Sequence, residues 1–183
     1  LTAVSRASSS LVLFLEHVPR TLGDWLREHR GYAWVEEGLA RGTAFMSSRG
    51  LVHFDAHFAN VLTDGRLLYF ADFGLALSSE FELSAAEAEF LSGHLSYDRA
   101  HTASHLLRHH LPDGLRGGME HDAFLRAWIA GHRPDGVPRA VSAILDRHAR
   151  TAVIFDEFAR RLLTESKRTP FPAAEIAYER VRG

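Results

Sequence analysis

The chain has 183 residues, 46% of them hydrophobic, and a formal net charge of -2. This length and hydrophobic content are enough to bury one core, so we expect one domain or a large piece of one. The net charge excludes the broad basic surface of a protein that binds nucleic acid electrostatically. Cysteine is absent, which excludes disulfides and Cys-based metal sites and fits a reducing, cytoplasmic location. The apolar run from Leu11 to Leu15 is too short to cross a bilayer, and no signal-peptide pattern is present, so we expect no membrane partner.

The first 50 residues predict one strand and two helices. The apolar run continues to Val18 as a buried strand that leaves into a polar turn. A short helix is expected after Thr21, an N-cap residue with Asp24 three positions later and apolar residues on one face. A longer helix is expected from Ala33 to Ser48, where apolar residues recur at helical spacing, and Gly50 ends it.

A hairpin is predicted between Asn60 and Asp72. The segment reads as a strand, a turn at Asp64-Gly65 and a second strand, because Asp-Gly between apolar runs is a strong hairpin signal. The hairpin folds the chain back, so Asn60 and Asp72 are expected to end near each other at one mouth of the sheet. Their oxygens suit a magnesium ion that takes phosphates and water as its other ligands.

Asp55, five residues before Asn60, completes a set of groups suited to phosphoryl transfer. A carboxylate there could orient an attacking hydroxyl and accept its proton, while Asn60 and Asp72 hold the metal. The alternative is that Asp55 and Asp72 are only turn or cap residues, as most aspartates in loops are. The order of the residues and the hairpin between them favour phosphoryl transfer.

Residues 84–183 predict a helical remainder. A capping box begins a helix at Ser84, and the spacing of apolar residues predicts helices over 122–130 and 139–165. His101, His105 and His109 fall on one face of another helix, a spacing that invites a metal site. No Cys or Glu ligand pattern accompanies them, so a polar helix face is the favoured interpretation.

The pattern H-x-D-x-x-x-x-N at His53, Asp55 and Asn60, followed by the spacer and D-F-G at Asp72, resembles the catalytic and metal-binding loops of the protein-kinase-like fold. This family includes protein kinases and the aminoglycoside and choline phosphotransferases. The resemblance implies a mainly α C-lobe with a small β-hairpin, part of an α+β fold whose N-lobe is largely absent from these residues. The chain would be one such lobe over 1–183, with a hinge-like strand at 1–18, the catalytic and metal-binding loops at 51–76 and the helical remainder at 84–183.

The same resemblance implies the cofactors and the roles of individual residues. ATP and Mg2+ would be bound, and the γ-phosphoryl group would pass to a hydroxyl-bearing acceptor. Asp55 would be the base, Asn60 and Asp72 would hold magnesium, and the backbone of Glu16, His17 and Val18 would receive the adenine edge.

Four further positions refine the comparison. His57 stands where protein kinases usually carry Lys. This pattern looks more like that of the small-molecule phosphotransferases and favours a small-molecule acceptor. The imidazole of His57 could donate to a phosphate oxygen or only order the loop. His53 would brace the loop and the DFG backbone. Phe54 replaces the Arg of H-R-D, so activation through that position is not expected. Asp98 could tie its helix to the catalytic loop, as in the family, or simply cap that helix, and capping is favoured.

No Gly-rich loop, strand Lys or helix Glu can be placed in the chain, and only Leu1 to Ser10 precedes the first apolar run. The chain is therefore expected to be the C-lobe of a longer protein, with the N-lobe segment as its missing partner, or a degenerate relative. The expected function is an ATP- and Mg2+-dependent phosphotransferase. The alternative is a pseudokinase or nucleotide-binding module without turnover, because the phosphate-clamping Lys is not present.

Overall fold

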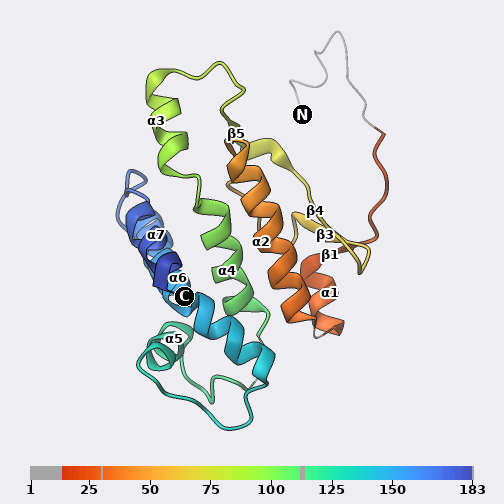
Figure 1. Ribbon diagram of the computed structural model, residues 1–183, viewed down its shortest axis with the longest axis vertical. Coiled ribbons are helices and arrows are strands. Elements are labelled where there is room, and N and C mark those ends of the chain that lie inside the picture. Colours follow the sequence, from red (N-terminus) through yellow and green to blue (C-terminus); the bar gives the residue numbers. More distant parts are fainter. Residues whose placement is uncertain (1–13, 30, 112–113, 183) are drawn as a thin grey trace.

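The computed structural model describes residues 14–29, 31–111 and 114–182, with the backbone alone for 178–182. The described residues are mostly helical, with two small antiparallel sheets (Figure 1). The helices are α1 (Leu22–Glu28), α2 (Tyr32–Ser48), α3 (Ala85–Gly93), α4 (Tyr97–His109), α5 (His121–Ile129), α6 (Arg139–Thr164) and α7 (Ala173–Arg182).

The larger sheet has the order β1-β3-β4, and the smaller one pairs β2 with β5. Strands β3 and β4 form the antiparallel hairpin, in which Val61 pairs with Phe70 and Thr63 with Leu68. The strands are β1 (Arg20–Thr21), β2 (Leu51–Val52), β3 (Val61–Thr63), β4 (Leu68–Phe70) and β5 (Leu77–Ser78), with a short 3-10 helix η2 (Phe73–Leu75) between β4 and β5.

The predicted hairpin is confirmed, with a longer turn than two residues. Four residues, 64–67, connect β3 to β4. Asp64 Oδ1 accepts from the backbone N–H groups of Arg66 and Leu67, both at 2.8 Å, and Gly65 takes φ 85°. The side chain of an aspartate at the start of a turn satisfies the backbone there, which explains why Asp-Gly marks this position correctly.

The helix boundaries predicted from capping residues are also confirmed. Thr21 is the N-cap of α1 and accepts from the N–H of Asp24 at 3.1 Å. Ser84 and Glu87 form a complete capping box at the start of α3. The helices expected at 33–48, 122–130 and 139–165 are present as α2, α5 and α6. Local hydrogen bonding and apolar spacing are sufficient to set these ends.

The hairpin packs closely on one side of α2, while α4 lies on the other (Figure 1). Gly38 and Gly42, one helical turn apart, make this approach possible. A Cβ at Gly38 would lie 2.8 Å from Leu68 Cδ1, and one at Gly42 would lie 2.3 Å from Phe70 Cε2. Glycine lowers the stability of a helix because it loses more backbone entropy on folding than other residues. At these two positions the close packing of β4 against α2 offsets that cost.

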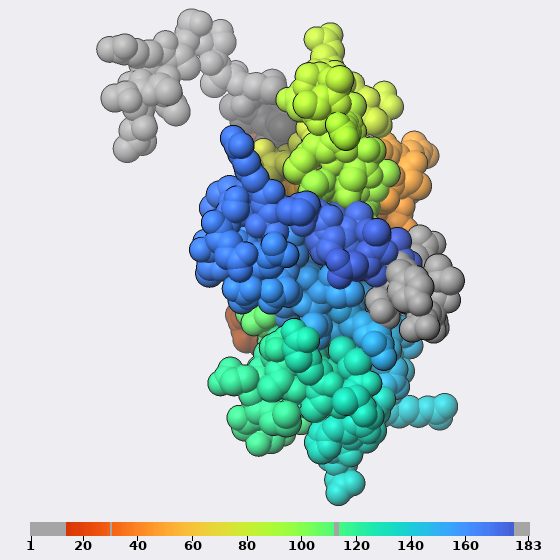
Figure 2. Space-filling view, turned by 90° about the vertical axis from the view of Figure 1, so that its left-hand side faces the viewer, coloured from red at the N-terminus to blue at the C-terminus, as the bar shows by residue number. Residues whose placement is uncertain are grey.

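The main core lies where α2, α4, α5 and α6 meet. Its buried members come from these four helices, from α1, from β3 and from the loop before β3. Figure 2 shows the face formed by α3, by α6 with α7, and by α5. The largest buried side chains include Trp128, Phe58, Phe124, Leu106, Leu107, Ile144 and Leu145.

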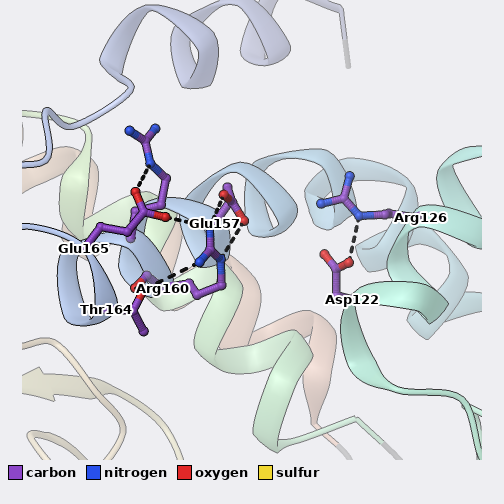
Figure 3. A network of polar contacts seen from close by, with 7 residues as sticks. Asp122, Arg126, Glu157, Arg160, Thr164 and Glu165 are labelled. Carbon is purple, nitrogen blue, oxygen red and sulfur yellow. Dashed lines mark hydrogen bonds and ion pairs between the residues drawn. The ribbon is translucent and has the colours of Figure 1, made fainter.

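Exposed ion pairs lie on the surfaces of α5 and α6. Arg160 donates to Glu157 at 2.6 Å and to Glu165 at 3.2 Å, and Arg126 donates to Asp122 at 2.7 Å (Figure 3). Pairs of this kind contribute up to about 1 kcal/mol each, because solvent screens them. The helical stack therefore depends on its buried apolar contacts.

The buried strand predicted to end at Val18 is wrong for the described residues. Residues 14–19 form no regular structure, and the side chains of Phe14 and Leu15 are 95% and 83% exposed. Leu11 to Leu13 lie outside the described residues. A strand needs a hydrogen-bonded neighbour, and in the described part of the chain sheet pairing begins only at Arg20, opposite Thr63. Apolar composition alone could not indicate that this neighbour is lacking.

Among the described residues, no helix combines the length and the apolar character that crossing a bilayer requires.

Candidate active site

His53 connects the loop after β2 to the end of the hairpin. Its side chain is fully buried, Nε2 lies 2.8 Å from the carbonyl oxygen of Ala71, and Nδ1 accepts from the N–H of Asp55 at 3.3 Å. One imidazole thus bonds to the residue before Asp72 and to the backbone of Asp55. The bracing geometry expected for His53 is present.

Asp98 fixes the same loop from the other side, and its predicted role as a helix cap is wrong. Its carboxylate accepts from the N–H of His53 at 2.6 Å and of Phe54 at 2.9 Å. The N-cap of α4 is instead Ser96, which makes no side-chain capping bond. Burial raises the pKa of the Asp98 carboxyl, and the two N–H groups oppose that rise. The capping interpretation failed because the partner lies 45 residues away in the chain.

Two non-glycine residues of the described chain have a left-handed backbone, and both lie in this site. Phe54 has φ 63° and Asp72 has φ 58°. Such conformations cost on the order of 1–3 kcal/mol each and persist where the surroundings impose them. At Phe54 the N–H bond to Asp98 supplies part of that constraint.

The Phe54 ring adds a hydrophobic anchor. It lies 5.1 Å from the ring of Tyr97 and 5.7 Å from that of Phe90, between centroids. His94 and Phe171 extend the group, with His94 stacked on both Phe90 and Phe171. We call these five residues the aromatic cluster. It joins α3, α4 and the segment before α7 to the loop. The only signal of it in the sequence was the Phe in place of the usual Arg.

Asp55, His57 and Asn60 are brought together as predicted. Asn60 Nδ2 donates to both the backbone oxygen and Oδ2 of Asp55, each at 3.0 Å. His57 Nε2 lies 3.5 Å from Asp55 Oδ1, and His57 Nδ1 accepts from the N–H of Ala59 at 3.2 Å. The last contact is the loop-ordering bond considered for His57, and Nε2 remains directed toward Asp55.

Asp72 lies beside this group at the mouth of the hairpin. The N–H of Ala71 donates to the backbone oxygen of Asn60 at 2.8 Å. Asp72 therefore directly follows the residue that pairs with Asn60. The exposed Asp72 carboxylate accepts from the N–H of Gly74 at 3.4 Å. Because the Asn60 amide nitrogen is engaged by Asp55, its oxygen is the atom left to bind a cation.

The donor set fits a hard cation that retains other ligands. Within the described chain no group of three or more His, Cys, Asp or Glu side chains could hold a metal ion. Asn60 and Asp72 together offer two oxygen donors, which suits magnesium bound mainly by phosphates and water. The site does not suit zinc, which prefers a closed set of nitrogen and sulfur ligands.

Glu16, His17 and Val18 lie outside this group. They form the irregular segment before β1, and the Glu16 carboxylate is near enough to β4 to contribute to the raised pKa of Tyr69, after burial and Asp64. Their proximity to a bound adenine stays a prediction.

The polar helix face predicted for His101, His105 and His109 is confirmed only at His109, which is exposed; His101 and His105 are largely covered by aromatic rings. His105 lies 4.6 Å from the Phe58 ring, and His101 stacks on Phe155 at 5.4 Å, between centroids. His110 stacks on Phe58 at 4.9 Å and lies 5.5 Å from His105, between centroids. Burial lowers the pKa of His101 to about 4, of His105 to about 3 and of His110 to about 4. These imidazoles serve as neutral packing groups.

A scan against models of known protein families found no match to this chain, and a search of curated proteins found none either.

We predict that Asp98→Ala lowers the free energy of unfolding by about 2–4 kcal/mol, because two buried N–H groups lose their acceptor and each such loss costs about 1–3 kcal/mol. The measurement is urea denaturation. Asp122→Ala, at an exposed ion pair, is the control and should change stability by less than about 1 kcal/mol. Equal effects of the two substitutions would contradict the role given to Asp98.

Acidification should destabilise the fold through the buried histidines. Their pKa values are lower folded than unfolded, so their contribution is complete above pH ~6.5 and is lost as pH falls toward 3–4. In that window each of these histidines lowers the free energy of unfolding by up to about 1.4 kcal/mol for every unit by which the pH falls. His105→Gln should reduce the slope of unfolding free energy against pH between 6.5 and 4, whereas the exposed His132→Gln should not.

Proposed function

We propose that this chain carries the catalytic and metal-binding loops of an ATP- and Mg2+-dependent phosphotransferase of the protein-kinase-like fold. The observation that carries the proposal is the placement of Asp55: its carboxylate is bonded to Asn60 and lies beside His57. Asn60 in turn pairs through its backbone with Ala71, the residue before Asp72. A base, an amide oxygen and a second carboxylate at one mouth are what phosphoryl transfer to a hydroxyl uses.

The supporting structure around Asp55 favours a functional loop over an ordinary turn. Phe54 is held in a strained conformation, His53 and Asp98 are buried to fix its backbone, and Asp72 is strained as well. Strain of this kind gathers at sites where a side chain must be aimed. A surface turn would gain nothing from two buried polar side chains.

In the proposed reaction, the oxygen of an acceptor hydroxyl attacks the γ-phosphorus of ATP. Asp55 accepts the hydroxyl proton, a P–O bond forms to the acceptor, and the bond to the leaving ADP breaks. Asn60 orients Asp55 through its amide N–H. His57 Nε2 is placed to bond Asp55 or, by rotation, a phosphate oxygen. Positioning and electrostatic stabilisation supply most of the rate in such transfers.

Magnesium, when bound, would neutralise charge on the phosphates, and Asn60 and Asp72 are the residues that would hold it. We favour a small-molecule acceptor over a protein, because His57 takes the place of the usual kinase Lys and Phe54 that of the Arg which docks an activating phosphate. Phe54 packs within the aromatic cluster, so its side chain anchors the loop through apolar contacts.

A nucleotide-binding protein without turnover is the second candidate. Lys167 is the single lysine of the chain and lies in the turn after α6, so these residues provide no lysine to clamp a phosphate at the site. The two candidates differ in whether Asp55 serves a transition state, which mutation can separate from binding.

Asp55→Asn should lower the rate of phosphoryl transfer by about 10²–10⁴-fold, the usual contribution of a catalytic base, and leave ATP affinity nearly unchanged. The assay is acceptor phosphorylation and ATP hydrolysis in the longest chain that contains these residues, with calorimetric ATP binding alongside. Asp122→Asn is the matched control. A parent chain that binds ATP but shows no turnover would favour the binding module, and unaltered turnover in Asp55→Asn would remove Asp55 as the base.

Asp72→Ala should weaken Mg2+-dependent ATP binding by at least about tenfold, because a carboxylate bound directly to a divalent ion supplies a charged oxygen that the imidazole of His57 cannot replace. His57→Ala should weaken it much less. Titrations of ATP with and without Mg2+ compare the two variants. Losses of similar size would show that the metal ligands are assigned wrongly.

A further inference from the structure

A cavity of about 460 Å³ lies away from the candidate active site, between α2, α4, α6 and α7. This volume is in the range of small-molecule sites. None of its lining residues belongs to the loops at 51–76. The lining residues are Thr43, Ala44, Ser47, Ser48, Leu95, Ser96, Arg99, Ala103, Arg147, His148, Thr151, Ile176 and Ala177.

The polar lining is rich in hydrogen-bond donors. It contains two guanidinium groups, one imidazole and five hydroxyls, and the lining residues that the structure describes include no carboxylate. The imidazole, that of His148, has its Nε2 2.7 Å from the carboxylate of Glu36, which lies outside the lining. A guanidinium has five N–H donors, so an existing partner leaves others over. For Arg147, Glu36 takes Nε at 2.8 Å and Nη2 at 2.6 Å, which leaves Nη1.

Two of the five hydroxyls have already given their single proton to the helix backbone: Thr43 donates to the oxygen of Leu39 and Ser48 to that of Phe45, each at 2.8 Å. The hydroxyl donors for a ligand are therefore Ser47, Ser96 and Thr151. Ser96 begins α4 without using its side chain as a cap. A hydroxyl at a helix start that does not cap its own helix is free to bond elsewhere, and it adjoins the positive end of the helix dipole.

The rest of the lining is apolar. Ala44 of α2, Leu95, Ala103 of α4 and Ile176 of α7 contribute carbon surface. A ligand that fills the space needs an apolar body for these residues and a group that accepts several hydrogen bonds for the donors. A negative group is favoured over a neutral one, because donors on Arg99 and Arg147 make charge-assisted bonds.

We propose that this cavity binds a small anionic amphiphile, a molecule with one carboxylate or phosphate group on an apolar body. The anionic group bonds Arg99, Ser96 and the remaining donor of Arg147, and the apolar body lies against Ala44, Ala103 and Ile176. Leu95, Ser96 and Arg99 flank Asp98, so the ligand sits within one helical turn of the carboxylate that holds the loop of Asp55.

The test uses octyl phosphate, octanoate, octanol and inorganic phosphate, titrated into the 183-residue chain by calorimetry below micelle-forming concentrations. Octyl phosphate and octanoate should each bind, and their relative affinities identify the preferred anion. Octanol and inorganic phosphate should bind at least about tenfold more weakly, since each lacks one half of the recognised chemistry. Octanol binding equal to that of both anions, equal binding of bare phosphate, or no binding of any probe would overturn the proposal.

Variants locate the binding. Arg99→Gln should weaken binding of the preferred anion about tenfold, and Ala44→Phe, at an exposed position of α2, should block it by filling the cavity. Arg41→Gln, on the same helix as Ala44 and outside the lining, should bind as the parent does. Thermal unfolding checks that each variant is folded. Unchanged binding in both Arg99→Gln and Ala44→Phe would place the probe elsewhere and refute the site.

Backbone amide spectra give a second readout that does not depend on any variant. Binding in the cavity should shift the amide resonances of Ser96 and Ala103 and leave that of Gly65, in the turn of the hairpin, unshifted. Shifts confined to the hairpin would contradict the proposal. Neither measurement involves ATP, so the result is independent of the proposed phosphotransfer.

Discussion

The carboxylate of Asp98 is the contact on which the geometry around Asp55 depends. It accepts two consecutive backbone N–H groups, from His53 and Phe54, and it comes from a helix that packs centrally against α2 and α6. A loop backbone in a strained conformation relaxes unless a rigid element opposes it. Because α4 is anchored in the core, the two bonds to Asp98 hold the loop backbone next to Asp55 against the helical stack.

Three kinds of interaction then act on the same short loop. The buried imidazole of His53 ties it to Ala71, the amide of Asn60 ties it to its own Asp55, and the Phe54 ring ties it to the aromatic cluster. Their partners come from the hairpin, from the loop itself and from the helices. A site whose orientation is set by partners on rigid elements needs little reorganisation when charge develops, which is the requirement for electrostatic catalysis.

Apolar side chains that follow Asp72 in the chain are exposed. Phe73 is 46% exposed and Leu75 is 66% exposed. Exposed apolar groups near a candidate site suit a covering element or a ligand with an apolar part. The cavity between α2, α4, α6 and α7 is lined in part by Ser96 and Arg99, which flank Asp98 at the start of α4. The helix that holds the loop of Asp55 therefore also borders the cavity.

The sequence by itself determined the local elements. Thr21, Ser84 and Asp64-Gly65 mark helix starts and a turn because their side chains or backbone satisfy hydrogen bonds within a few residues, and apolar spacing identified α2, α5 and α6 correctly. The approach of the chain at Asn60 to the chain before Asp72 also followed, since a hairpin brings its two ends together. Tertiary structure alone decided the rest. Asp98 bonds across 45 residues, His105 and His101 of α4 pack against Phe58 and Phe155, and the apolar residues Phe14 and Leu15 stay exposed. In each case the deciding partner is distant in the chain or missing from the described residues, and no local pattern encodes that.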